Sequence, residues 1–424
     1  MLGAAVPLIF LHAHYQPHVH LGGGVSIDLS DLAVLAAFVA TLATARHVGL
    51  EPLARLPWLW GIAALLLVVI AASTIYGKAT DSRYLLGAHA VTALKWTEYS
   101  TLALAAAYLA RTRAQQRILL GALVAWSIAM TTVGLLQFLG VLVEFQGLRP
   151  GQREPAYVGI HDFAVLSGGA LAVALAVLAL GAPDRVERSL AWAGGVSGAL
   201  GVALSGSIFA LAGVALAAAA AVLARWRLRG FSARRTAAIA AIVAAVAAGV
   251  LGLRAHNVEQ FLSFLGINVH RHETQQGASG AHRTVLAYIG GRIFVAHPLF
   301  GVGWQGSAYE ENFGPYLAAA RRRFPSVDPY DLPSQDHRWG VQNGYIQAAA
   351  DMGVIGLSAF LATLVAAIAA AIRGLRRAAG ALALVPLLWL LVAAGVWNAL
   401  GLYAGIPLEA FTWLGIGLAA VAGE

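Results

Sequence analysis

Charged side chains are scarce in this chain. Asp, Glu, Lys and Arg make up 11% of its 424 residues, against roughly 25% in a soluble globular protein. Hydrophobic residues account for 59% of the sequence, and the mean hydropathy is +0.73. This composition excludes an ordinary water-soluble enzyme, a nucleic-acid-binding domain and a disordered chain, because each of these needs more charged surface. It predicts an integral membrane protein.

Cysteine is absent, which excludes a disulfide, a cysteine metal site and a cysteine nucleophile. Lysine is almost absent as well, since 26 of the 28 basic residues are arginine. The net charge of +8 is distributed between apolar runs, so membrane topology has to be considered before any anionic ligand.

Twelve apolar runs approach the length of about 20 residues that a bilayer-spanning helix needs. The first run is short, and it lacks the basic start and the cleavage site of a signal peptide, so we expect a retained helix. Residues 1–253 would form nine spans and residues 352–424 three more, with a long loop at 254–351 between them. The predicted spans cover approximately 2–13, 30–45, 57–76, 94–110, 118–143, 161–182, 189–204, 207–224, 236–253, 352–372, 379–402 and 405–422.

The basic residues predict the orientation of these spans. Fifteen of the 28 lie in alternate short loops, which the positive-inside rule assigns to the cytoplasm. Loops of the other set contain none at 14–29, near 205–207 and near 403–406, so both termini are expected in the cytoplasm. The cytoplasmic set comprises Arg46, Arg55, Arg111, Arg113, Arg117, Arg185, Arg188, Arg225, Arg227, Arg229, Arg234, Arg235, Arg373, Arg376 and Arg377.

Eight of the other 13 basic residues fall in the long segment from Arg254 to Asp351. A long loop translocates whatever its charge, so one interpretation is a solvated cap. The other is an anion site on the outer face, which we favour because arginine forms paired hydrogen bonds with phosphate.

Ionisable side chains are rare inside the spans, where an ion or proton pathway would need them. Glu98, Asp351 and Glu409 lie near span ends, and we find no clear internal repeat of the kind common in transporters. The chemistry is therefore expected at the outer membrane surface.

The long loop contains the most informative motifs. Residues 283–297 have the length of an apolar helix lying in the membrane interface, ended by Pro298. Arg283 opens this helix, and His297-Pro-Leu-Phe-Gly-Val-Gly303 closes it. Farther on, nine residues separate Asn343 from Gly353-x-x-Gly356. These motifs, together with twelve spans and one large outer loop, resemble the O-antigen ligase and polymerase superfamily.

The sequence departs from the family pattern at two positions. Gln342 stands where the family has a histidine before Asn343, and the nearest histidine is His337. Ile208 stands where the family tends to have an arginine after the serine of the turn at Ser207.

The resemblance implies an all-α, GT-C-like integral membrane protein of about 12 transmembrane helices, with one large periplasmic loop between helices 9 and 10. It implies a multi-pass protein of the bacterial inner membrane with a periplasmic active site. It also implies a glycosyltransferase of lipopolysaccharide biosynthesis, moving O-antigen from undecaprenyl diphosphate to the lipid A core oligosaccharide. The other expected contacts are membrane lipids, with no nucleic acid.

Alternatives to a ligase remain open. An O-antigen polymerase and a protein O-oligosaccharyltransferase belong to the same superfamily, and a non-enzymatic transporter of lipid-linked sugars is the alternative from another class. The Gly353-x-x-Gly356 spacing favours the ligase. Because the diphosphate donor is already activated and no metal or nucleotide motif is present, we expect no cofactor and a metal-independent reaction.

Two residues are predicted to be catalytic. Arg283 would stabilise the leaving diphosphate, because both a guanidinium and the amides of a helix N-terminus favour anions. His337 would be the general base that accepts the proton of the attacking hydroxyl. The alternative is a loop histidine bonded to Asp336 or to a backbone carbonyl.

Six further residues are predicted to bind substrate. The arginines would add positive charge near the diphosphate, or anchor the protein by snorkelling to the interface. The two amides would orient the sugar, or cap the tenth span. The set comprises Arg149, Arg153, Arg292, Arg338, Gln342 and Asn343.

Overall fold

The computed structural model describes residues 1–22, 25–143, 150–264, 279–325, 327, 329–335, 340–403 and 406–422. Apart from one hairpin, the regular elements in these ranges are all helical. The helices are α1 (Leu2–Ile9), α2 (Leu29–Val48), α3 (Glu51–Ala54), α4 (Pro57–Thr80), α5 (Leu86–Leu109), α6 (Arg113–Phe138), α7 (Ile160–Leu180), α8 (Arg185–Ser205), α9 (Ile208–Arg229), α10 (Ala233–Phe264), α11 (Ser279–Ala296), α12 (Glu310–Arg323), α13 (Gly344–Ala378), α14 (Ala381–Val396) and α15 (Ile406–Val421). Short 3-10 turns are η1 (Ala13–Tyr15), η2 (Gly306–Ala308) and η3 (Pro329–Asp331), and β1 (His18–Gly22) pairs antiparallel with β2 (Val25–Asp28).

Each of the twelve predicted runs corresponds to one helix. Seven helices are long and apolar enough to cross a membrane by length and composition: α2, α4, α6, α7, α9, α10 as far as Ala255, and α13. The apolar helices α14 and α15 are shorter, with 16 residues each. α1 has only eight residues, and it is followed by η1 and the hairpin. The chain is thus a helical protein with several apolar helices of spanning length, and the count of twelve spans stays a prediction.

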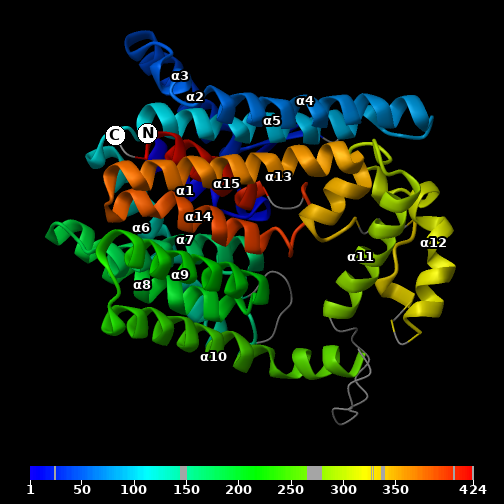
Figure 1. The fold of residues 1–424 in the computed structure, drawn as a ribbon. Helices are drawn as coiled ribbons and strands as arrows, with labels where there is room; N and C mark the ends of the chain where they lie inside the picture. The colour runs from blue at the N-terminus through cyan, green and yellow to red at the C-terminus, as the bar shows by residue number, and fades with distance from the viewer. Residues whose placement is uncertain are drawn as a thin grey trace.

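The long helices lie side by side in a bundle, with both chain termini at one end and α11 and α12 at the other (Figure 1). α7 is the central helix, since 89% of its most apolar 18-residue stretch is buried. Small residues let its neighbours approach closely: a Cβ on Gly198 of α8 would lie 2.5 Å from the backbone nitrogen of Leu171.

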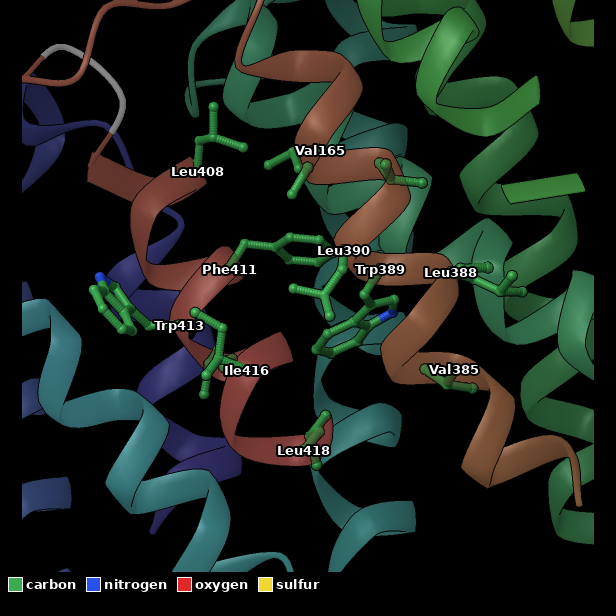
Figure 2. Packing of buried hydrophobic residues seen from close by; sticks show 14 of the residues in the cluster. Val165, Val385, Leu388, Trp389, Leu390, Leu408, Phe411, Trp413, Ile416 and Leu418 are labelled. Atoms are coloured by element: carbon green, nitrogen blue, oxygen red, sulfur yellow. The ribbon is translucent and has the colours of Figure 1, made fainter. Parts of the chain in front are cut away.

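Aromatic rings fill the space where α14 and α15 meet beside α7. Trp389 of α14 and Phe411 of α15 are fully buried, with ring centroids 4.7 Å apart. Figure 2 shows these two rings pointing toward each other, with Leu390 and Val165 close by. This packing fixes the C-terminal helices against the centre of the bundle.

The two motif segments of the long loop are in direct contact with each other. α13 is broken at Gly353, whose φ is 64° and ψ −161°. The amide of Val354 donates to the carbonyl of Pro298 at 2.7 Å, and the amide of Val302 donates to the carbonyl of Ala350 at 3.1 Å. A Cβ on Gly353 would lie 2.2 Å from the Leu299 carbonyl oxygen, so only glycine fits. The Pro298–Gly303 turn is thereby seated on the break in α13.

A second, smaller core holds the cap of α11 and α12 together. Val285, Ile289 and Ile293 of α11 pack with Phe313 and Ala320 of α12. The predicted helix over 283–297 is present as α11, which packs against α12 and α13. It begins at Ser279, so the expectation that Arg283 opens the helix is wrong and Arg283 lies in its second turn. The position of α11 in a membrane interface stays a prediction.

Candidate functional site

A cavity of about 480 Å³ opens at the N-terminal half of α11. Its walls come from the loop before α7, the start of α7, the turn between α8 and α9, α10, α11 and the segment before α13. Aspartate and glutamate are absent from its described lining, which comprises Arg153, His161, Gly206, Ser207, Ile208, Phe209, Arg254, Arg283, Thr284, Ala287, Gln342, Asn343 and Asn398.

Three arginines concentrate positive charge in this cavity. Burial, followed by the charges of Arg153 and Arg254, lowers the pKa of Arg283 to about 10. Burial, followed by the charge of Arg254, lowers the pKa of Arg153 to about 10. Both groups therefore stay protonated at neutral pH. Arg254 is 8% exposed, and within the described chain its Nε has no hydrogen-bond partner.

Arg283 is held by two uncharged side chains. Its Nη2 donates to Nε2 of His161 at 2.7 Å, and its Nε donates to Oε1 of Gln342 at 3.2 Å. The other ring nitrogen of His161, Nδ1, lies 3.3 Å from Oγ of Ser207. The amide nitrogen of Gln342 lies 3.5 Å from Nε2 of His282.

The turn between α8 and α9 forms one wall of the cavity. Its two residues, Gly206 and Ser207, end one helix and begin the next. Gly206 ends α8 in the left-handed region with φ 58°, and Ser207 caps α9 by accepting from the amide of Ala210 at 3.3 Å. A Cβ on Gly206 would lie 3.1 Å from Cβ of Arg153 and 3.5 Å from Cδ of Arg254. The absence of a side chain at this position therefore leaves room for both arginines.

Asn343 performs the capping role that was one of its two sequence interpretations. Its side-chain oxygen accepts from the amides of Tyr345 and Ile346, at 3.1 and 3.0 Å, at the start of α13. Its amide nitrogen donates to Oδ1 of Asn398 at 3.3 Å. Because Asn343 also lines the cavity, its capping role is compatible with a contact to a bound sugar.

Four of the eight predicted site residues come together in the cavity, namely Arg153, Arg283, Gln342 and Asn343. Arg292 does not line it; this arginine is exposed, and its Cζ lies 5.9 Å from the ring centroid of Tyr316 on α12. The remaining three, Arg149, His337 and Arg338, lie outside the described residues.

The structure adds residues that the sequence interpretation did not select. His161 and Asn398 were counted as parts of apolar spans, and Ser207 as part of a turn. Arg254 was one of many outer arginines, with nothing in its sequence context to distinguish it. Polar residues at the ends of apolar runs were the available signal.

The described cavity is suited to an anion of several charges. Guanidinium groups donate paired hydrogen bonds to phosphate oxygens, and Phe209, Ile208 and Ala287 give the same cavity an apolar side. No group of three His, Asp or Glu side chains that could hold a metal ion is found in the described part of the chain.

Comparison with known proteins identifies one family. The family model described as O-antigen ligase matches residues 193–361, from within α8 to the second part of α13. The match includes the cavity residues Ser207, Arg254, Arg283 and Gln342, whereas His161 lies outside it. No curated protein matches the chain.

Proposed function

We propose that this chain is a glycosyltransferase acting on a diphosphate-linked polysaccharide, because its residues 193–361 match the family model described as O-antigen ligase. The donor in this proposal is O-antigen carried on undecaprenyl diphosphate, and the acceptor is the lipid A core oligosaccharide. The reaction would take place on the periplasmic face of the bacterial inner membrane. The observation that supports the proposal best is the cavity with three arginines and no acid in its described lining.

The arginines match the electrostatic requirement of the leaving group. The anomeric carbon–oxygen bond breaks with its electron pair on the diphosphate, so negative charge accumulates there in the transition state. Preorganised cations aimed at developing charge are among the largest contributions to catalysis. Arg283 is assigned this role, with Arg153 and Arg254 beside it.

The acceptor completes the displacement. Its hydroxyl oxygen forms the new bond to the anomeric carbon, and the hydroxyl proton passes to a general base. We propose His337 as this base. Asn343 is proposed to orient the sugar, while Gln342 holds Arg283.

The other predicted arginines would serve the larger parts of the substrates. Arg149 and Arg338 are proposed to contact donor phosphate. The exposed position of Arg292, on α11 beside Tyr316 of α12, suits a contact with headgroup or acceptor phosphates. No cofactor is required by this scheme, since the leaving group is activated and the cations come from the chain.

The evidence for the acceptor comes from the amino-acid sequence and not from the cavity. The cavity supports a diphosphate donor, which a ligase and a polymerase would share, and the Gly353-x-x-Gly356 spacing favours the ligase. The acceptor must therefore be identified by experiment.

The test is transfer by purified protein in vitro. Undecaprenyl diphosphate-linked glycan and lipid A core oligosaccharide are supplied with EDTA and without ATP, and Arg283→Ala is the inactive control. We expect a glycosylated core. Lengthening of the lipid-linked glycan with an unmodified core would identify a polymerase, and an unchanged donor with folded protein would contradict both the ligase and the polymerase.

A further inference from the structure

We propose that His161 is a positioning residue that orients Arg283 toward the diphosphate as an uncharged hydrogen-bond acceptor, with Ser207 accepting from its other ring nitrogen. The inference rests on the proposed function, because it assigns Arg283 to the leaving group. It adds a residue from α7, which lies outside the segment matched by the family model.

The hydrogen bonds determine the tautomer of His161. A guanidinium has only donors, so Nε2 of His161, 2.7 Å from Nη2 of Arg283, must accept. A neutral imidazole then carries its proton on Nδ1, which faces Oγ of Ser207 at 3.3 Å. Ser207 itself is fixed as the cap of α9. The chain Ser207–His161–Arg283 thus sets the orientation of the guanidinium from the turn at the start of α9.

A neutral acceptor orients a cation without cancelling its charge. A carboxylate in the place of His161 would hold Arg283 equally well, but it would form an ion pair and compete with the diphosphate for the same donors. Gln342, the second partner of Arg283, is also uncharged. The acid next to His161 in sequence, Asp162, hydrogen-bonds to the backbone of Leu408 and is not among the cavity residues.

The same contact separates the role of His161 from that of a general base. The lone pair on Nε2 is occupied by the Arg283 donor, and Nδ1 carries the proton. His161 therefore acts on the reaction through Arg283, and the proton of the acceptor hydroxyl goes to another group.

Three substitutions at position 161 distinguish these roles. His161→Gln keeps a neutral acceptor, His161→Glu keeps an acceptor but adds a negative charge, and His161→Leu keeps bulk without an acceptor. Transfer would be measured as KM for undecaprenyl diphosphate-linked glycan and kcat, with binding of undecaprenyl diphosphate measured separately. Folding of each variant is checked by gel filtration and by its melting temperature.

We expect His161→Gln to retain donor binding and transfer within about tenfold of the wild type. His161→Leu and His161→Glu should each weaken donor binding by about 10- to 100-fold, the first through lost orientation and the second through lost net charge. If His161→Leu misfolds, the comparison of Gln with Glu still decides the question.

Other results would overturn the inference. Wild-type behaviour of His161→Leu would mean that the residue only fills space, and wild-type behaviour of His161→Glu would remove the requirement for neutrality. A His161→Gln variant that binds donor normally but has lost kcat would identify His161 as the base itself. The wild-type protein tests the proposed function independently of these variants. If it neither binds undecaprenyl diphosphate nor transfers glycan, the proposed function is wrong, whatever the variants at position 161 do.

Discussion

Arg283 is a cation held in place by groups that leave its charge intact. Its two described side-chain partners, His161 and Gln342, are neutral, and Arg153 and Arg254 add positive charge beside it. Such an arrangement opposes folding, because like charges repel and burial removes water. A site of this kind is useful when a polyanion enters and replaces the lost solvation.

The first prediction concerns Arg283. Arg283→Ala should lower transfer by at least about 100-fold, because one preorganised donor to developing charge is worth about that much. The protein should remain folded, since the guanidinium makes polar contacts and its removal relieves repulsion. Transfer is measured in the reconstituted assay, with the exposed Arg322→Ala on α12 as the matched control. An active Arg283→Ala variant would remove this residue from the mechanism.

A second prediction tests the repulsion itself. Arg153→Gln should raise the melting temperature of the ligand-free protein by about 2–4 °C, because it removes one of three neighbouring cations. Burial, followed by the charges of Arg153 and Arg254, lowers the pKa of Arg283. The same substitution should weaken binding of undecaprenyl diphosphate. The measurement is thermal unfolding with and without that lipid, with Arg322→Gln as the control. A lower melting temperature without ligand would mean that Arg153 stabilises the fold through a pair.

At the residue scale the sequence predicted the charged half of the site better than its neutral half. Arg283 was selected because it was predicted to open a helix and belongs to a motif. α11 begins earlier, at Ser279, and the structure places Arg283 in the cavity. His161 and Asn398 were missed because each was counted within an apolar run, where a single polar residue attracts no attention. The role of His161 depends on Arg283, which lies more than a hundred positions away in the sequence. A local sequence pattern cannot show such a contact.

At the scale of elements, the break in α13 connects the two motifs of the long loop. The Pro298–Gly303 turn occupies the break, and the first part of α13 carries Asn343 and the neighbouring Gln342 to the cavity. A change at Gly353 should therefore affect both the docking of α11 and the position of the site.

Gly353→Ala is the third prediction. A φ of 64° with a ψ of −161° is a conformation available almost only to glycine, and a Cβ would also approach the Leu299 carbonyl oxygen to 2.2 Å. We expect a loss of about 1–3 kcal/mol or more in the free energy of unfolding, together with reduced transfer. Thermal unfolding and the transfer assay provide the measurement.

The control for this substitution is Gly291→Ala on α11. Gly291 has open space around its Cβ position, and alanine is favoured over glycine inside a helix by about 1 kcal/mol. Stability should be unchanged or higher. Equal behaviour of the two variants would show that the break in α13 does not require glycine.

The sequence predicted the existence of the elements more accurately than their geometry. Every apolar run is a helix, because apolar segments in a membrane protein must satisfy their backbone hydrogen bonds internally. The β1–β2 hairpin and the break at Gly353 were not predicted. These features depend on how the segments pack together, and hydropathy does not record packing.

At the scale of the whole molecule, the cavity and the arginine-rich short loops are at opposite ends of the bundle. α11 and α12 lie at one end of the bundle and both termini at the other (Figure 1). The arginine-rich short loops of the positive-inside set predict that the end with the termini faces the cytoplasm. The cavity would then face the periplasm, where lipid-linked O-antigen and lipid A core would meet.

The fourth prediction tests this orientation with single cysteines, which is direct because the chain has none of its own. Ala318→Cys lies on the exposed face of α12, and Ala233→Cys is exposed at the start of α10. In spheroplasts, a membrane-impermeant maleimide should label the cysteine at 318, because it lies on the side of the cavity. The cysteine at 233 should react only after the membrane is permeabilised, since it adjoins the arginines at 234 and 235. The reverse pattern would place the cavity on the cytoplasmic side and contradict periplasmic transfer. Labelling of both sites in intact spheroplasts would contradict the alternation of loops from which the orientation is predicted.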